Sequence, residues 1–388
     1  MPADRILLFR ESVIRMMTRL AIEHQAINLS QGFPDFDPPL ELREAAVRAI
    51  MDGSNQYSPT WGLPALRRKL AERYTAALGW PVDPDEHVTI TCGVTEAINA
   101  AMLAVLNPDD EVIILEPAHE NYIPSAIFAG AKPVAVPLEP PAYRLDPQRL
   151  AAAVSLRTRA LILNTPHNPT GRVFDAEELA AVAELVVRHD LVLITDEIYD
   201  RILYDGREHI FPGSLDGLRE RTITAGGLGK TFAVTGWRLG YVVAPGPLSA
   251  AVRPVHDFLT VCAPTPLQAA AVAALELPPA YYETLRAEYH ERRAIMMEIL
   301  RRANFSAPVP EGSYYVLADY SELPLAQAEW DSMRFAEWLV KEHGVAVVPG
   351  FVFYSLPGYG DRSVRFAFPK KLQTLRAAGE RLERMLAG

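Results

Sequence analysis

Short apolar runs alternate with helix-like stretches between residues 87 and 244. The runs consist mostly of Val, Ile, Leu and Thr, a composition typical of strands that are buried on both faces of a parallel sheet. Strands that alternate with helices predict an α/β fold with a seven-stranded, mainly parallel sheet flanked by helices. The seven runs are 87–93, 111–117, 132–138, 160–166, 191–197, 222–228 and 238–244.

Residues after 264 follow a different pattern. Helical spacing runs from 265 to 303, with an interruption at the prolines 278 and 279, and a terminal helix is predicted from Leu372. Between these helices lie three strand-like segments, at 314–319, 345–349 and 363–367. This mixture predicts a second, smaller α+β domain.

Length and pattern together predict the domain boundaries. A chain of 388 residues exceeds one ordinary domain. The first residues lack the strand–helix rhythm, and we expect them to pack on the smaller domain. The predicted parts are an N-terminal segment over residues 1–45, a large domain over 46–280 and a C-terminal small domain over 281–388.

Composition narrows the class of protein. A net charge of −10 argues against nucleic acid as the main partner, because phosphate backbones need a basic surface. The two cysteines, Cys92 and Cys262, form no disulfide framework and no metal-ligand spacing, which suits a reducing compartment. No apolar stretch approaches the roughly 20 residues of a membrane span. We therefore expect a cytoplasmic protein that uses no metal and binds no membrane.

The most informative segment spans residues 227–240. Lys230 follows an apolar strand and a glycine-rich turn, where loss of hydration would lower the pKa of its amine and make it a competent nucleophile. Arg238, eight positions later, offers a planar fork suited to a phosphate group. A surface loop that holds one lysine and one arginine explains these two residues equally well.

The Gly-Lys-Thr triplet at 229–231 also imitates the end of a nucleotide-binding P-loop. That pattern requires a glycine at position 224, where this chain has Thr224. The acidic strand 191–197 also precedes the lysine, which inverts the usual order. A P-loop protein is therefore a distant alternative.

Three other predicted strands lead into segments that contain polar residues or glycine. Ligands of open α/β sheets bind at the carboxyl ends of strands, so these residues are candidates for one site. Each of them alone is explained equally well by a turn or a helix cap. They are Asp196 and Tyr199 after 191–197, Asn168 after 160–166, and Gly93, Val94 and Thr95 after 87–93.

Taken together, these segments resemble the fold-type I, pyridoxal-phosphate-dependent class I/II aminotransferases. The segment 227–240 fits the lysine motif of that family throughout, and the other segments follow in the family's order, ending with a late arginine, Arg365. The similarity covers almost the whole chain. Segments 28–36 and 55–57 look most like the kynurenine, glutamine and methionine aminotransferase branch.

The resemblance implies how a cofactor is held. Lys230 would carry pyridoxal 5'-phosphate as a Schiff base and move the proton between substrate and cofactor, while Asp196 would keep the ring nitrogen protonated. Asn168 and Tyr199 would bind the ring hydroxyl. The phosphate would be held by Gly93, Val94, Thr95, Arg238 and, reaching in from a neighbouring subunit, Tyr57. That last contact implies a homodimer with sites at the subunit interface.

The same resemblance implies how the substrate binds. Arg365 would clamp the α-carboxylate of an amino acid as a bidentate fork, helped by Gly32 and Asn168. Phe33, Trp61 and Tyr314 are candidates for the side-chain pocket. The implied reaction moves an amino group from a neutral L-amino acid, such as methionine, glutamine or an aromatic one, to a 2-oxo acid.

Three positions depart from the family pattern. His119 stands where relatives usually place an aromatic ring over the cofactor, with Tyr122 as the other candidate. Since His titrates near neutrality, we expect cofactor affinity to depend on pH. Gly227 replaces a frequent phosphate-binding serine. Val261 replaces a phenylalanine that relatives offer to the partner's pocket, which disfavours large aromatic substrates.

Two further alternatives involve the same residues. A lyase that uses the same cofactor would expel a leaving group from a cysteine conjugate and release ammonia and pyruvate, and the sequence separates it poorly from an aminotransferase. A catalytically inactive binding protein is disfavoured, because every cofactor-contacting residue type except the serine is present.

Overall fold

All seven predicted strands form and pair into one sheet in a computed structural model of the chain, which describes residues 3–9, 11–323 and 330–386. The strand order is β2-β8-β7-β6-β5-β3-β4, with β8 antiparallel to both neighbours and the other pairs parallel. The strands are β2 Val88–Thr91, β3 Glu111–Glu116, β4 Lys132–Pro137, β5 Thr158–Asn164, β6 Val192–Asp196, β7 Thr222–Gly227 and β8 Gly240–Val243.

The continuous apolar runs follow from burial on both faces of this sheet. Leu161 and Leu193 belong to the core on one face, together with Val182 of α7. Ile162 and Ile194 belong to the core on the other face, which α4 covers. Because successive side chains of a strand point to opposite faces, both sets must be apolar.

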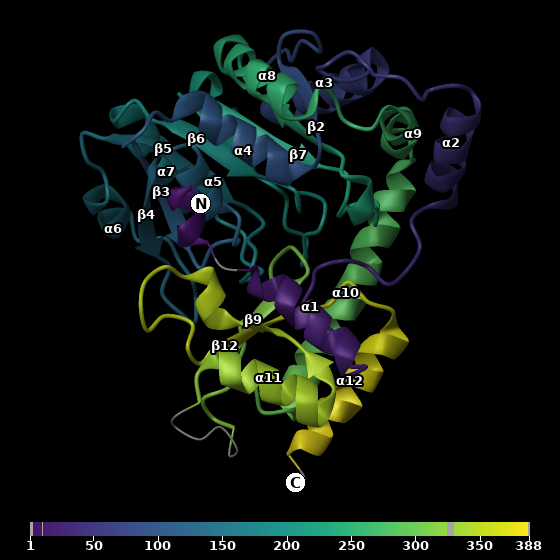
Figure 1. The fold of residues 1–388 in the computed structure, drawn as a ribbon, viewed down its shortest axis with the longest axis vertical. Helices are drawn as coiled ribbons and strands as arrows, with labels where there is room; N and C mark the ends of the chain where they lie inside the picture. Colours follow the sequence, from purple (N-terminus) through teal and green to yellow (C-terminus); the bar gives the residue numbers. More distant parts are fainter. Residues whose placement is uncertain (1–2, 10, 324–329, 387–388) are drawn as a thin grey trace.

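Helices pack on both faces of the sheet and at its edge (Figure 1). Helix α7 begins with a capping box, in which Asp175 and Glu178 each accept the other's backbone N–H. The helices of this part are α2 Leu40–Met51, α3 Pro64–Leu78, α4 Val94–Val105, α5 Tyr122–Phe128, α6 Pro147–Ala152, α7 Ala176–Arg188, α8 Gly246–Thr260 and α9 Thr265–Leu275.

A smaller α+β layer lies below the large sheet in Figure 1. Its three-stranded antiparallel sheet has the order β11-β12-β9, and β1 pairs in parallel with β10 beside it. The predicted strand 345–349 is divided at Val347, so that β10 and β11 serve two different sheets. The elements are α1 Val13–Glu23, β1 Ile27–Asn28, α10 Pro279–Arg302, β9 Tyr315–Asp319, α11 Ser332–His343, β10 Val345–Ala346, β11 Val348–Pro349, β12 Ser363–Ala367 and α12 Leu372–Met385.

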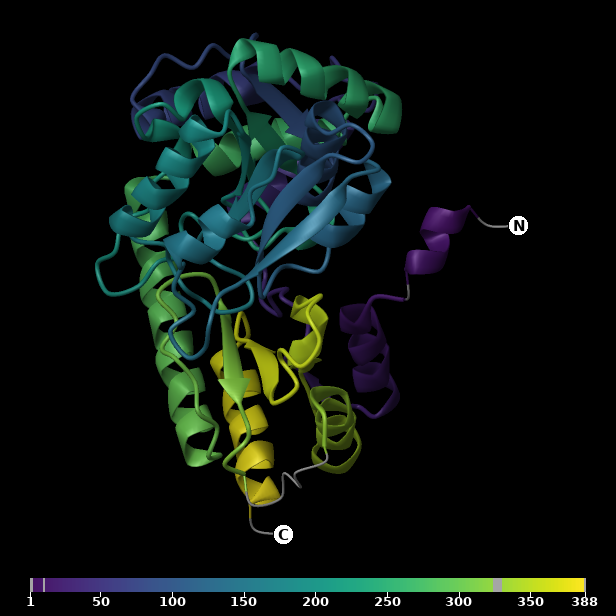
Figure 2. The same ribbon diagram turned by 90° about the vertical axis from the view of Figure 1, so that its left-hand side faces the viewer.

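The N-terminal residues contribute to both parts. Helix α1 and strand β1 contact the smaller layer, whereas α2 packs against α9 beside the large sheet. The boundaries placed at 45 and 280 remain predictions. The short helix Asp4–Leu8 stands away from the body as an arm, with Leu7 and Leu8 each 69% exposed (Figure 2). Among the described residues, no helix is both long enough and apolar enough to cross a membrane.

Candidate active site

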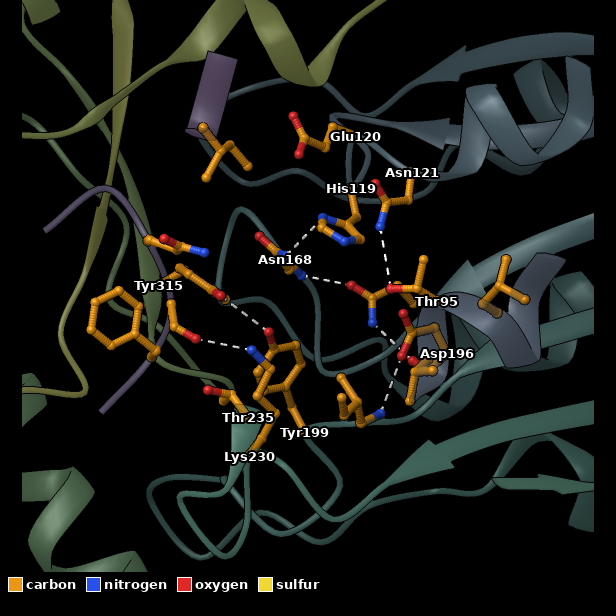
Figure 3. A pocket seen from close by; sticks show the side chains of 18 of the residues that line it. Thr95, His119, Glu120, Asn121, Asn168, Asp196, Tyr199, Lys230, Thr235 and Tyr315 are labelled. Atoms are coloured by element: carbon orange, nitrogen blue, oxygen red, sulfur yellow. Dashed lines mark hydrogen bonds between the residues drawn. The ribbon is translucent and has the colours of Figure 1, made fainter. Parts of the chain in front are cut away.

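A cavity of about 440 Å³ opens where the carboxyl ends of β5 and β6 face the smaller layer (Figure 3). Its walls come from segments far apart in the sequence, which the fold brings to one place. The predicted residues that line it are Gly32, Phe33, Val94, Thr95, His119, Asn168, Asp196, Tyr199, Lys230, Arg238 and Arg365.

Lys230 projects into this cavity from the turn after β7 (Figure 3). Its Nζ donates a hydrogen bond to the carbonyl of Gly32 at 2.9 Å and lies 5.8 Å from the ring centre of Tyr199. Burial lowers the pKa of the Lys230 amine, and the positive charge of Arg365 acts in the same direction. The site therefore favours the neutral, nucleophilic form of this amine.

Asp196 is the last residue of β6 and is 5% exposed. Its Oδ2 accepts a hydrogen bond from the Tyr122 hydroxyl at 2.7 Å, and its Oδ1 accepts the N–H of Ile198 at 3.3 Å. Burial raises the pKa of Asp196 to about 6. A carboxylate whose charge is so poorly hydrated is suited to a cationic ligand group.

A phosphate-sized cradle lies at the start of α4. Gly93 has φ +82, and its missing side chain leaves room for the guanidinium of Arg238, since a Cβ there would lie 2.5 Å from Nη2. No side chain caps the N–H groups of this helix, which begins at Val94. Uncapped helix N–H groups beside a guanidinium form an anion site.

Arg365 lies in β12 and is only 1% exposed. Its Nη1 donates to Oδ1 of Asn168 at 2.8 Å and its Nη2 to the carbonyl of Ser30 at 2.6 Å. Within the described part of the chain, its Nε has no hydrogen-bond partner and no carboxylate pairs with it. A buried guanidinium held only by neutral acceptors gains stability when a carboxylate binds.

His119 and Tyr122, the two candidates for packing on the cofactor ring, both line the cavity but have different partners. The Tyr122 hydroxyl is committed to Asp196, and the two rings meet edge to face at 5.7 Å. Burial, together with the charges of Arg365, Lys230 and Arg15, lowers the pKa of His119 to about 3. His119 is therefore neutral at physiological pH, and the expectation that its titration near neutrality would control cofactor affinity was wrong.

Several lining residues escaped the sequence analysis. Asn164 joins the two turns, because its side chain donates to the carbonyl of Asp196 at 2.8 Å and accepts the N–H of Asn168 at 2.7 Å. Tyr315 lies 3.2 Å, hydroxyl to hydroxyl, from Tyr199. The signal for Asn164 was its place at the end of a predicted strand; Tyr315 carried none, since its neighbour Tyr314 looked equivalent.

Two candidate pocket residues do not line this cavity. Tyr314 lies behind it, with its hydroxyl donating to the carbonyl of Gly32 at 2.9 Å. Trp61 lies against Arg253, whose guanidinium carbon is 4.0 Å from the ring centre of Trp61. Tyr315, the first residue of β9, lines the cavity, whereas Tyr314, which precedes the strand, does not. Tyr57, predicted to act in a neighbouring subunit, is 81% exposed.

The P-loop alternative requires the triplet 229–231 to open an α-helix. In the structure a 3₁₀ turn, Thr235–Trp237, follows instead. The helix whose N-terminus faces the cavity is α4, from another segment. This geometry contradicts nucleotide binding by a P-loop.

The profile of the family described as aminotransferase class I and II matches residues 24–382. The chain belongs to the class I and II aminotransferases. Enzymes of this family generally depend on pyridoxal phosphate. Membership confirms the resemblance drawn from the lysine motif, and it establishes the chain as a transaminase with this family's fold.

The names of individual relatives specify different substrates, although these relatives are nearly equally similar in sequence to this chain. The chain is 38% identical to the methionine aminotransferase of Escherichia coli K12, covering 99% of this chain and 98% of that protein. It is 38% identical to human kynurenine–oxoglutarate transaminase 1, covering 94% of each. The solved structure of N-succinyldiaminopimelate aminotransferase from Mycobacterium tuberculosis superposes with a TM-score of 0.95 at 38% identity, covering 99% of this chain and 100% of that one. Overall identity therefore does not separate these substrates.

Proposed function

We propose that this aminotransferase uses pyridoxal 5'-phosphate, bonded to Lys230, to move the amino group of a neutral L-amino acid to a 2-oxo acid. One observation supports the proposal above the others. The same cavity holds a half-buried amine, a buried carboxyl group and a buried guanidinium that has no carboxylate partner among the described residues, at Lys230, Asp196 and Arg365. These are complementary to an aldehyde, a ring cation and a carboxylate.

The cradle at the start of α4 fits the phosphate of that cofactor. Gly93, Val94 and Thr95 would offer backbone and hydroxyl donors, and Arg238 a guanidinium. Asp196 would pair with the ring nitrogen and keep its proton there. Asn168 and Tyr199 would bind the ring hydroxyl, and the neutral ring of His119 would pack on the cofactor.

When bound, the cofactor supplies an electron sink for the electrons left at the substrate Cα. The side chains do the remaining work. Arg365 would hold the substrate α-carboxylate through its fork, oriented by Asn168. The Lys230 amine, with its lowered pKa, would accept the proton from the substrate Cα and deliver it to the C4′ carbon of the cofactor.

The substrate end of the cavity favours neutral side chains. Arg15 and Glu120 both line it, and the Glu120 carboxylate accepts hydrogen bonds from the Ser12 hydroxyl at 2.7 and 2.9 Å. Their opposite charges together give this end no net attraction for an acidic or a basic side chain. Phe33 and Ile14 add apolar surface. The names of the methionine and kynurenine relatives agree with this class.

We also propose that the enzyme works as a homodimer. Exposed apolar side chains gather where the end of α8 meets the segment 57–61, since His256 Nε2 is hydrogen bonded to the carbonyl of Thr60 at 2.9 Å. Tyr57 is 81% exposed there and Phe258 91%. Such a patch suits a subunit interface, from which Tyr57 would reach the partner's cofactor.

An absorption spectrum tests the proposal. The purified protein, incubated with pyridoxal 5'-phosphate and freed of excess, should show a visible band that Lys230→Ala lacks. Adding single neutral amino acids should reduce that band while an ultraviolet band grows. Aspartate and lysine should act much more slowly. A protein that stays colourless would refute the role of Lys230, and pyruvate release from a cysteine conjugate as the main reaction would favour the lyase.

A further inference from the structure

A second cavity, of about 370 Å³, lies on the other side of the segment that follows β6. Its walls come from α3, from residues 200–211 and from α10. Four arginines line it, together with the carboxylates of Asp200 and Glu208: Arg73, Arg201, Arg207 and Arg286. None of these residues lines the candidate active site.

The positive charges of this cavity are only partly balanced. Arg73 forms an ion pair with the buried Asp200, and Arg207 pairs with Glu311. Within the described residues, neither Arg201 nor Arg286 has a carboxylate partner or a side-chain hydrogen bond. The guanidinium carbon of Arg201 lies over the ring of Tyr282, 4.9 Å from the ring centre. Glu208 and Arg286 are both exposed, so solvent screens the two opposite charges alike.

Buried polar atoms in the same walls also lack partners. Among the described residues, Nε of Arg73, Nε of Arg201 and Nδ1 of His209 have no hydrogen-bond partner. The His209 side chain is only 4% exposed, and its Nε2 is already engaged by Glu197 at 2.6 Å. Because Nε2–H donates to Glu197, Nδ1 of the neutral His209 ring is an acceptor, whereas the two arginine Nε–H groups are donors that an anion can satisfy. Buried polar atoms without partners are rare in folded proteins, because each one costs desolvation energy. Their concentration here points to a ligand.

We propose that this cavity binds a small phosphate-bearing anion. A carboxylate has two oxygens and is satisfied by a single guanidinium fork, whereas Arg201 and Arg286 approach from two different elements. A tetrahedral dianion presents enough oxygens to accept from both forks at once. The net charge of −10 does not prevent this, because recognition depends on the local pocket.

Binding would also connect two parts of the molecule. Arg201 lies two residues after Tyr199 of the active site, and Arg286 lies on α10, which continues into the smaller layer. An anion held by both would tie these elements together. We therefore expect phosphate to raise the unfolding temperature of the enzyme.

Isothermal titration calorimetry of inorganic phosphate into the cofactor-loaded enzyme tests the proposal. The loaded enzyme is used because the cofactor then fills the phosphate region of the active site. The wild type should show one saturable site. The double variant Arg201→Gln/Arg286→Gln should bind at least about tenfold more weakly, with transaminase activity unchanged. Arg68→Gln, an exposed arginine of α3 outside this cavity, is the matched control and should bind like the wild type. Absence of binding to the wild type, or equal affinity in the double variant, would overturn the proposal.

Chemical protection gives a second test that needs no variant. Phenylglyoxal modifies accessible guanidinium groups, and mass spectrometry locates them. Phosphate should slow the modification of Arg201 and Arg286 but not that of Arg68; equal rates with and without phosphate would refute the site. Glycerol 3-phosphate distinguishes the source of the ligand. Tighter binding than inorganic phosphate indicates a phosphorylated metabolite, and weaker binding indicates free phosphate.

Discussion

Asp196, Lys230 and Arg365 owe their chemistry to burial. Each has an ordinary ionisable side chain, yet loss of water raises the pKa of Asp196 to about 6 and lowers the pKa of the other two. A bound cofactor and substrate would restore the missing countercharges. At the residue scale the cavity is thus prepared for a ligand of matching charge pattern.

The pKa of Asp196 leads to a pH prediction. Its carboxylate can pair with the ring nitrogen only when ionised, so cofactor affinity should fall as pH drops through about 6 and be constant above it. The measurement is the dissociation constant of pyridoxal 5'-phosphate against pH for the wild type and Asp196→Asn. Taking the ratio between the two cancels the titration of the cofactor itself. The dissociation constant of Asp196→Asn divided by that of the wild type should decrease below about pH 6.

The variants His119→Phe and Tyr122→Phe test which side chain sets the inflection in this pH profile. Because the pKa of His119 is lowered to about 3, His119→Phe should leave the inflection in place. The Tyr122 hydroxyl donates to Asp196 and lowers its pKa, so Tyr122→Phe should move the inflection to higher pH. An inflection that vanished in His119→Phe would show that the histidine titrates instead.

At the scale of elements, the residues that begin helix α7 have two structural roles. Asp175 and Glu178 form the capping box at its start. Glu178 also pairs with Arg172 and accepts the N–H of Leu145 at 2.8 Å. Both charged side chains of that pair are buried, at 9% and 3% exposure. The first turn of α7 therefore also provides the countercharge for the buried guanidinium of Arg172.

This dual role predicts unequal costs of substitution. Asp175→Ala removes one cap and should destabilise the protein by about 1 kcal/mol. Glu178→Ala also leaves Arg172 buried without a countercharge and should cost about 3–5 kcal/mol. Arg144→Ala, which breaks only the exposed pair with Asp175, should change stability by less than about 1 kcal/mol. Urea unfolding of the three variants measures the order, and equal losses for Asp175→Ala and Glu178→Ala would contradict it.

For the whole molecule, the exposed apolar patch near Tyr57 is the feature that a single chain leaves unexplained. Phe258 and Leu156 are both almost fully exposed, at 91% and 96%, but Leu156 lies in the loop before β5, away from α8. Phe258→Asp should shift the enzyme from dimer to monomer and weaken cofactor binding, since Tyr57 would lose its partner. Leu156→Asp should do neither. Sedimentation equilibrium and cofactor titration measure both effects, and a wild-type monomer would refute the dimer.

The sequence predicted most of the large sheet because each strand is buried on both faces and so carries its own apolar signal. It predicted the site residues at the strand ends for a related reason, since turns there need Gly, Pro and Asn. It placed no division within 345–349, because pairing with β1 on one side and β12 on the other leaves no mark in the residues themselves.

By itself, the sequence determined the fold class, the aminotransferase family and many of the residues that meet in the cavity. Only the tertiary structure decided that His119 is neutral, that Tyr122 serves Asp196 and that Tyr315 rather than Tyr314 reaches the cavity. It alone brought four arginines from distant segments to a second cavity. The physical reason is that local patterns are set by neighbours along the chain. Burial, countercharges and hydrogen-bond partners depend on residues that meet only after folding.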